Sequence, residues 1–118
     1  MMRKTTVLLA LLLLPAMSMA AQLLIPMDET QTDHLKAYGV IYKTLDAGGK
    51  GEWLLNFRGG SFLIDYNQEN VNLCLLMGVK AEQVTEGQVS DIYRQIEVEN
   101  MERVELEKAP SIAVYSPP

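Results

Sequence analysis

The segment EWLLNFRGGSFLIDY, residues 52–66, determines how the rest of the chain is expected to fold. Two apolar runs, residues 53–57 and 61–66, flank the tripeptide Arg58-Gly59-Gly60. Adjacent glycines reach positive φ at little cost, so this tripeptide predicts a tight reversal between two strands. The patterns on both sides are helical and need an apolar surface to cover. The segment therefore predicts a central β-turn unit against which helices pack.

Outward from this unit, strand and helix patterns alternate. Residues 23–27 are continuously apolar, as in a buried strand, and residues 30–46 have helical spacing with Asp28 offered as the cap. A second helix is expected from residues 67–70 to Met77, and a third over residues 85–96, where Thr85 and Gln88 have capping-box spacing. The remaining expected strands are a weak one at 79–84, an edge strand at 103–107 and a buried one at 111–115.

This alternation predicts an α/β fold, specifically a layered Rossmann-like arrangement with a sheet that is incomplete in this chain. The expected division is a signal peptide at residues 1–20, an α/β N-terminal domain at 21–110, and the first strand of a following region at 111–118. The last expectation depends on residues 111–115, which resemble the opening strand of a further βα unit.

The N-terminus has the order of charged, apolar and small residues found in secretory signal peptides. Arg3 and Lys4 precede the apolar run 7–14, and Ser18-Met19-Ala20 follows. The apolar stretch is shorter than the roughly 20 residues that span a bilayer, which favours cleavage after Ala20 over a retained anchor. We therefore expect a secreted or periplasmic protein with no stable membrane anchor after cleavage.

Charge and cysteine content exclude several classes of function. The net charge is −5, and removal of Arg3 and Lys4 would lower it by two more. Such an acidic chain is a poor match for nucleic acid, whose phosphates require basic patches. Cys74 is the only cysteine, so no intrachain disulfide can form. It lies among apolar residues and is interpreted as a small core side chain.

Two groups of residues are candidates for chemistry. In Arg58, Gly59, Gly60 and Ser61, backbone amides beside glycines could hold an anion while the guanidinium clamps a carboxylate or phosphate. The alternative is a plain turn. The second group begins with Asp28 and Glu29 and extends to Asp33 and His34 at the expected start of the first helix. Capping would explain its carboxylates without a ligand.

A small anionic or amide compound is the ligand that these groups would bind. The sequence contains no catalytic Ser/His/Asp order, no metal-spaced Cys/His cluster and no dinucleotide-binding glycine motif. It gives no reason to expect a metal or a cofactor, and it identifies no catalytic residue. The aromatic side chains at 38, 42, 53, 57, 62 and 66 have the spacing of core residues.

Several segments together resemble the N-terminal portion of a group of secreted bacterial proteins labelled "asparagine synthetase B". The resemblance is carried by residues 23–31, 34–39, 53–63, 106–110 and 112–117, of which 53–63 are the most specific. It implies a longer secreted protein whose missing C-terminal region would pack with this one. The chain departs from true glutamine-dependent asparagine synthetases, because it has neither their N-terminal cysteine nucleophile nor their ATP-binding loop.

Three functions follow as alternatives. The first is an N-terminal α/β segment of such a secreted protein, without complete catalytic machinery in these residues. The second is an amidotransferase or amidohydrolase acting on a small amide or carboxylate, with Arg58 as the clamp. The third is a small extracytoplasmic interaction module that pairs through an exposed strand at 79–84 or 103–107.

Overall fold

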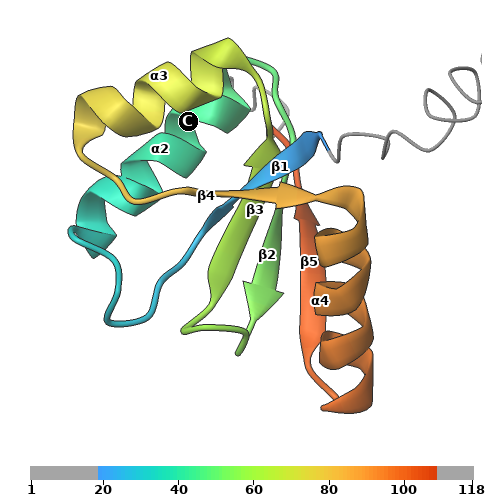
Figure 1. Ribbon diagram of the computed structural model, residues 1–118. Coiled ribbons are helices and arrows are strands. Elements are labelled where there is room, and N and C mark those ends of the chain that lie inside the picture. Colours follow the sequence, from blue (N-terminus) through green and yellow to red (C-terminus); the bar gives the residue numbers. More distant parts are fainter. Residues whose placement is uncertain (1–18, 109–118) are drawn as a thin grey trace, which may run out of the picture.

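The computed structural model describes residues 19–108, which form three helices and five strands (Figure 1). In chain order the elements are β1 (Ala20–Ile25), α2 (His34–Asp46), β2 (Gly51–Leu55), β3 (Ser61–Asp65), α3 (Gln68–Met77), β4 (Glu82–Thr85), α4 (Glu86–Val98) and β5 (Glu102–Leu106). The expected strand at 111–115 and residues 1–18 of the expected signal peptide lie outside the described residues. None of the helices within 19–108 is long and apolar enough to cross a membrane.

The five strands form one open sheet in the order β4-β1-β3-β2-β5, and every neighbouring pair is antiparallel. The first six elements follow the order β-α-β-β-α-β with strand order 4-1-3-2, which is the split βαβ or ferredoxin-like topology. The predicted α/β class is confirmed. The Rossmann-like detail is not, because each crossover helix joins strands separated by a third that runs the opposite way.

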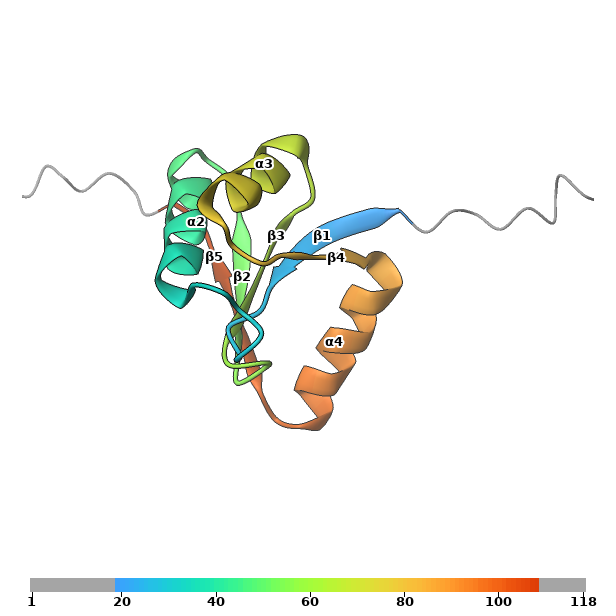
Figure 2. The same cartoon turned by 60° about the vertical axis from the view of Figure 1, so that its left-hand side comes forward.

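Helices cover both faces of the sheet, as Figures 1 and 2 show. On the two-helix face, α2 and α3 pack against strand residues that include Leu23, Ile25, Phe62 and Ile64. On the α4 face, α4 packs against Leu24, Leu54, Leu63 and Val84. Consecutive strand residues thus alternate between two cores, which explains why strands read as continuously apolar in the sequence.

The core of the two-helix face includes the predicted buried cysteine. Cys74 on α3 is 3% exposed and belongs to the same cluster as Val40 and Ile41 of α2. Burial raises the pKa of its thiol, which keeps the thiol protonated and poorly nucleophilic. The interpretation of Cys74 as a small core side chain is confirmed.

The central β-turn unit is present, with shorter strands and a longer turn than expected. β2 and β3 pair with Trp53 opposite Phe62, and the connection runs from residue 56 to 60. Asn56, Arg58, Gly59 and Gly60 all have positive φ. The expectation that Phe57 ends the first strand is wrong, because its amide bonds back to Leu54 and its carbonyl accepts from Gly60 and Ser61. A multi-residue turn therefore replaces a tight one.

Helix boundaries follow their capping residues. α2 begins at His34 with Asp33 as its N-cap, whose side chain accepts from the amide of Lys36. The expected cap at Asp28 is wrong, because the chain between the two residues holds a loop anchored by the buried Gln31 amide. The capping box of Thr85 and Gln88 at the start of α4 is confirmed. α2 ends before Gly48, whose φ is positive.

Candidate functional site

The two predicted site segments meet in space at the end of the sheet where β1 finishes and the β2–β3 turn reverses. The amide of Met27 donates to the carbonyl of Arg58 at 3.1 Å. At Gly59, φ is +82° and a Cβ atom would lie 2.5 Å from the Met27 carbonyl oxygen. Only glycine fits there, so the β1–α2 loop and the turn can touch backbone to backbone. This contact brings Asp28 beside Arg58.

Arg58 forms the centre of a polar group that we call the Arg58 cluster, which consists of Asp28, Thr30, Arg58 and Glu82. Its Nε donates to Asp28 Oδ2 at 2.8 Å, and one terminal nitrogen donates to both carboxylate oxygens of Glu82 at 2.9 and 3.0 Å. The other terminal nitrogen donates to the Thr30 hydroxyl at 3.2 Å. The guanidinium thereby ties together the turn, the β1–α2 loop and β4.

Hydrogen bonds within this cluster favour the charged forms of Asp28 and Arg58. The hydrogen bonds that Arg58 donates to Glu82, followed by the one that it donates to Asp28, raise the pKa of Arg58. The hydrogen bond from the Thr30 hydroxyl, followed by that from Arg58, holds the pKa of the Asp28 carboxyl well below its usual range. Asp28 and Arg58 therefore stabilise each other's charged forms, and the guanidinium lies between two acidic side chains.

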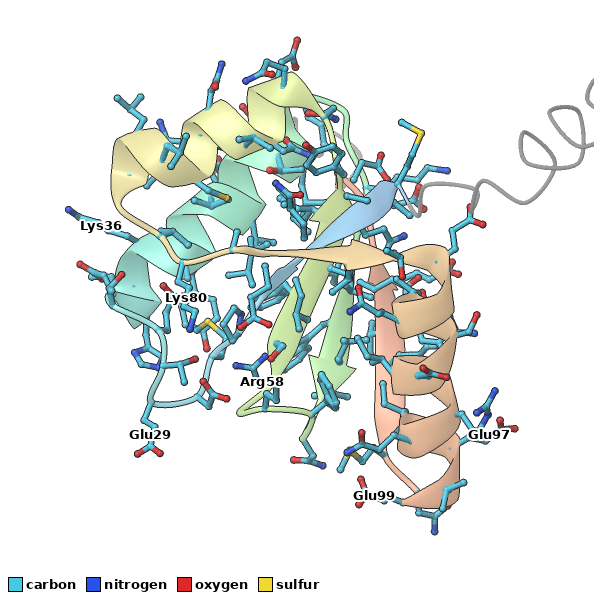
Figure 3. All side chains as sticks on the ribbon, viewed as in Figure 1. Glu29, Lys36, Arg58, Lys80, Glu97 and Glu99 are labelled. Carbon is cyan, nitrogen blue, oxygen red and sulfur yellow. The ribbon has the colours of Figure 1, made fainter. Side chains whose placement is uncertain are left out.

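The turn amides predicted to hold an anion are also occupied by protein groups. The amides of Gly60 and Ser61 both donate to the Phe57 carbonyl, at 3.0 and 2.9 Å, and the Ser61 hydroxyl donates to the Arg58 carbonyl at 3.0 Å. Glu29 lies beside the cluster and points away from the sheet into solvent (Figure 3). Anion binding at Arg58 stays a prediction, and an anion would have to displace Asp28 or Glu82.

The other residues of the predicted acid-histidine group have structural partners. Nε2 of His34 lies 3.0 Å from the Met27 carbonyl and 2.9 Å from that of Asp28, which fits an N–H donated to the loop backbone. Asp33 is the α2 cap. Among residues 19–108, no group of three or more His, Cys, Asp or Glu side chains is placed to hold a metal ion.

Both strands predicted to be exposed lie at the edges of the sheet, β4 at one and β5 at the other. β4 has only four residues, its Glu82 is bound to Arg58, and α4 begins at the next residue after it. β5 has five residues, of which the first four are exposed. The longer and less encumbered edge is therefore β5.

An aromatic surface lies beside β5 on the two-helix face. Val104 of β5 is opposite Trp53 of β2, and these side chains are 38% and 36% exposed. Trp53 stacks on Phe62 with ring centroids 6.2 Å apart and donates from Nε1 to the Gly60 carbonyl, while Tyr38 meets Phe62 edge-on at 5.8 Å. These contacts hold the rings rigid. α2 and α3 expose further apolar side chains at Leu35, Tyr42, Leu75 and Leu76.

On the α4 face, β5 supplies a charged group instead. Tyr93 of α4 donates its hydroxyl to Glu52 at 2.7 Å, and Arg103 of β5 lies 4.1 Å from the centre of the Tyr93 ring and 3.5 Å from the Glu52 carboxylate. Burial, followed by the hydrogen bond to Glu52, raises the pKa of Tyr93 to about 12. Glu105 is directly opposite Glu52 on the neighbouring strand, which places two like charges side by side.

A cavity of about 290 Å³ adjoins this charged group. Its lining includes Gln22, Glu52, Asp65 and Glu105, with Lys50 as the basic residue among them. Gln22 Oε1 is buried without a hydrogen-bond donor, and Glu52 Oε2 is buried with the 3.5 Å ion pair to Arg103 but no hydrogen bond. Sequence reasoning missed this site because its residues come from four strands, and none is part of a recognisable motif.

We compared the chain with known protein families, curated proteins and solved structures. No protein-family model, no curated protein and no solved structure matches the chain.

Proposed function

We propose that the chain is the N-terminal α/β domain of a secreted bacterial protein and that it binds another polypeptide by pairing with the edge strand β5. The observation that carries this proposal is the position of β5 at the end of the sheet with four exposed residues. The signal-peptide pattern and the resemblance of residues 53–63 support secretion and a place in a longer protein. Cleavage after Ala20 would leave the β1–β3 register from Gln22 to Ile25 intact.

An edge strand suits this role for a general reason. Its outer row of backbone N–H and C=O groups has no partner within the sheet, and an extended segment of another polypeptide can satisfy them. Alternate side chains then supply specificity on each face. In β5, Val104 faces the aromatic surface, while Arg103 and Glu105 face the charged group. A binding strand would meet Val104 and Leu106, with Glu102 at the end of the row, on one side and a charged row on the other.

The environments of Cys74, Ser61 and His34 support a binding role over catalysis. Cys74 is buried, the Ser61 hydroxyl donates to a backbone carbonyl, and His34 contacts only loop carbonyls among its hydrogen-bond partners. Covalent catalysis requires a nucleophile within hydrogen-bond reach of a base. These three side chains lie on different elements and are not joined in that way.

Site-specific photocrosslinking tests the proposal in the producing cell. A photoreactive phenylalanine derivative replaces Val104 in the full chain, and the same derivative at exposed Glu97 on α4 is the control (Figure 3). We expect a covalent adduct with a polypeptide at position 104 and none at 97. Absence of an adduct at 104, in cells where the chain accumulates in folded form, would overturn the proposal.

The cavity beside Glu52 favours a second candidate function, the binding of a small amide or amine. The buried Gln22 Oε1 has no N–H donor, Glu52 Oε2 has only the ion pair to Arg103, and the excess of carboxylates in the lining favours a neutral amide or a cation over an anion. Titration calorimetry with acetamide and methylammonium tests it. Heat of binding that disappears in Glu52→Gln would support this function, and no heat at millimolar concentration would exclude it.

A further inference from the structure

We propose that the polypeptide bound by β5 is a second copy of this chain, with the two β5 strands antiparallel and related by a two-fold axis at Val104. This inference rests on the proposed function of β5 as a pairing edge. A symmetric pair continues the sheet from one copy into the other and keeps like faces on the same side. The partner strand therefore has the sequence Glu-Arg-Val-Glu-Leu as well.

The charges of β5 select this register. When the axis passes through Val104, Arg103 lies opposite Glu105 of the partner subunit, and Glu105 lies opposite Arg103 of the partner subunit. Opposite charges directly across a strand pair stabilise the pairing. An axis at Arg103 or at Glu105 would instead set two like charges against each other. Among the registers that keep like faces together, the one centred on Val104 thus has two complementary pairs.

The same register relieves an unfavourable contact within each copy. Glu105 lies opposite Glu52 in the β2–β5 pair, and the Arg103 side chain is 47% exposed while it contacts Glu52 at 3.5 Å. In the dimer a second guanidinium, from Arg103 of the partner subunit, would approach Glu105 from the other side. Each carboxylate would then have a cation next to it.

The apolar face is also completed by a second copy. On the two-helix face, Val104 would meet Val104 of the partner subunit, and the exposed edges of both Trp53 rings would lie near this contact. The shared contact is short, so we expect a weak, concentration-dependent dimer rather than an obligate one. Because the charge pairs are near solvent, salt should weaken it.

Charge exchange tests this dimer in the full chain by sedimentation equilibrium. The unchanged chain should dimerise with rising concentration. Glu105→Arg places arginine against arginine, and Arg103→Glu places glutamate against glutamate, so each variant should dimerise at least tenfold more weakly. A one-to-one mixture of the two variants should form a heterodimer, because both cross-strand pairs become complementary. Glu97→Arg, the same charge change on α4, should behave as the unchanged chain (Figure 3).

The outcomes separate this inference from the proposed function. A chain that stays monomeric at millimolar concentration, or variants that fail to associate when mixed, would overturn the dimer. Circular dichroism of Glu105→Arg alone guards against loss of fold, because this change removes a like charge opposite Glu52 and should leave the domain folded. A photoadduct at position 104 with the mass of two chains would support the dimer. An adduct with a different polypeptide would overturn it and leave the proposed function standing.

Discussion

Arg58 and Arg103 each form an ion pair with a glutamate, but their surroundings differ. Arg58 lies in the β2–β3 turn and Arg103 lies within β5. Arg58 has hydrogen bonds of 2.8–3.2 Å to three side chains, two of which come from the β1–α2 loop and one from β4. Arg103 lies on the outermost strand, 3.5 Å from its one carboxylate partner among the described ion pairs, and is half exposed. A guanidinium whose donors are used internally stabilises the fold, whereas one held loosely at an open edge is available to a partner.

The largest effect should come from the backbone contact on which the Arg58 cluster depends. In Gly59→Ala the new Cβ would overlap the Met27 carbonyl, and alanine would be held at positive φ. We expect a loss of about 3 kcal/mol in the free energy of unfolding. Urea denaturation measures it.

The matched control is Gly78→Ala, because Gly78 also has positive φ but has open space around its Cβ position. It should cost only about 1 kcal/mol. Equal losses at the two positions would show that the loop and the turn can separate easily. Arg58 would then not be held more firmly than Arg103, contrary to the comparison above.

Removal of the Arg58 side chain should have the next largest effect. Arg58→Ala leaves Asp28 and Glu82 as neighbouring carboxylates without a counterion, and we expect a loss of about 2 kcal/mol. Arg58→Lys should recover part of the lost free energy of unfolding, because an ammonium restores the charge but not the planar set of N–H donors of a guanidinium. Denaturant midpoints give the ranking.

Arg94→Ala is the control for this change, because the Arg94–Asp91 pair on α4 is exposed and 3.5 Å long. It should cost less than about 0.5 kcal/mol. If Arg58→Ala were equally mild while abolishing binding of a small carboxylate, the ligand-clamp interpretation of the turn would be favoured.

These contrasts also show what the sequence could predict. Three local signals were reliable, because the capping box of Thr85 and Gln88, the hairpin around Gly59 and the burial of Cys74 could be predicted from neighbouring residues. The Asp28 cap was not, because Asp33 is the residue that caps α2. Strand direction was not, because apolar strands covered on both faces look alike in parallel and antiparallel sheets.

The partners of Arg58 were hidden for a related reason. Glu82 is 24 positions away along the chain and reaches the guanidinium only because β4 pairs with β1. Because β1 pairs with β3, the β1–α2 loop lies beside the β2–β3 turn, and Asp28 and Arg58 belong to one cluster rather than to two sites. In the same way, the openness of β5 is a property of its place in the sheet and not of its five residues.

On the β5 side, Tyr93 links the charged group to α4 and should give a smaller, pH-dependent effect. Tyr93→Phe removes its hydrogen bond to Glu52, at a cost of about 1 kcal/mol at neutral pH. The pKa of Tyr93 is raised from 10.0 to about 12 in the folded protein, so its contribution is complete below pH 10 and is lost as the pH rises toward 12. The difference in stability between the unchanged chain and the variant should shrink over this interval.

Denaturation at about pH 8 and about pH 11.5, below and above the ordinary tyrosine pKa of about 10, measures that difference. Tyr42→Phe is the control, because Tyr42 is 70% exposed. A constant difference at the two pH values would indicate that the Tyr93 hydroxyl does not hold Glu52 in solution.

The smallest effect on the stability of a single copy should come from Glu105→Arg. Glu105 lies opposite Glu52, so the substitution replaces a like-charge pair with an opposite-charge pair and should raise the free energy of unfolding by about 0.5 kcal/mol. Urea denaturation at micromolar protein, where the weak dimer is dissociated, measures it against Glu97→Arg. The same substitution should weaken dimerisation, so a residue whose charge disfavours its own domain would be retained at the edge for its partner. A variant less stable than the unchanged chain would instead show that Glu105 already has a stabilising cation within its own copy. The charges of β5 would then give no reason to expect a partner strand at this edge.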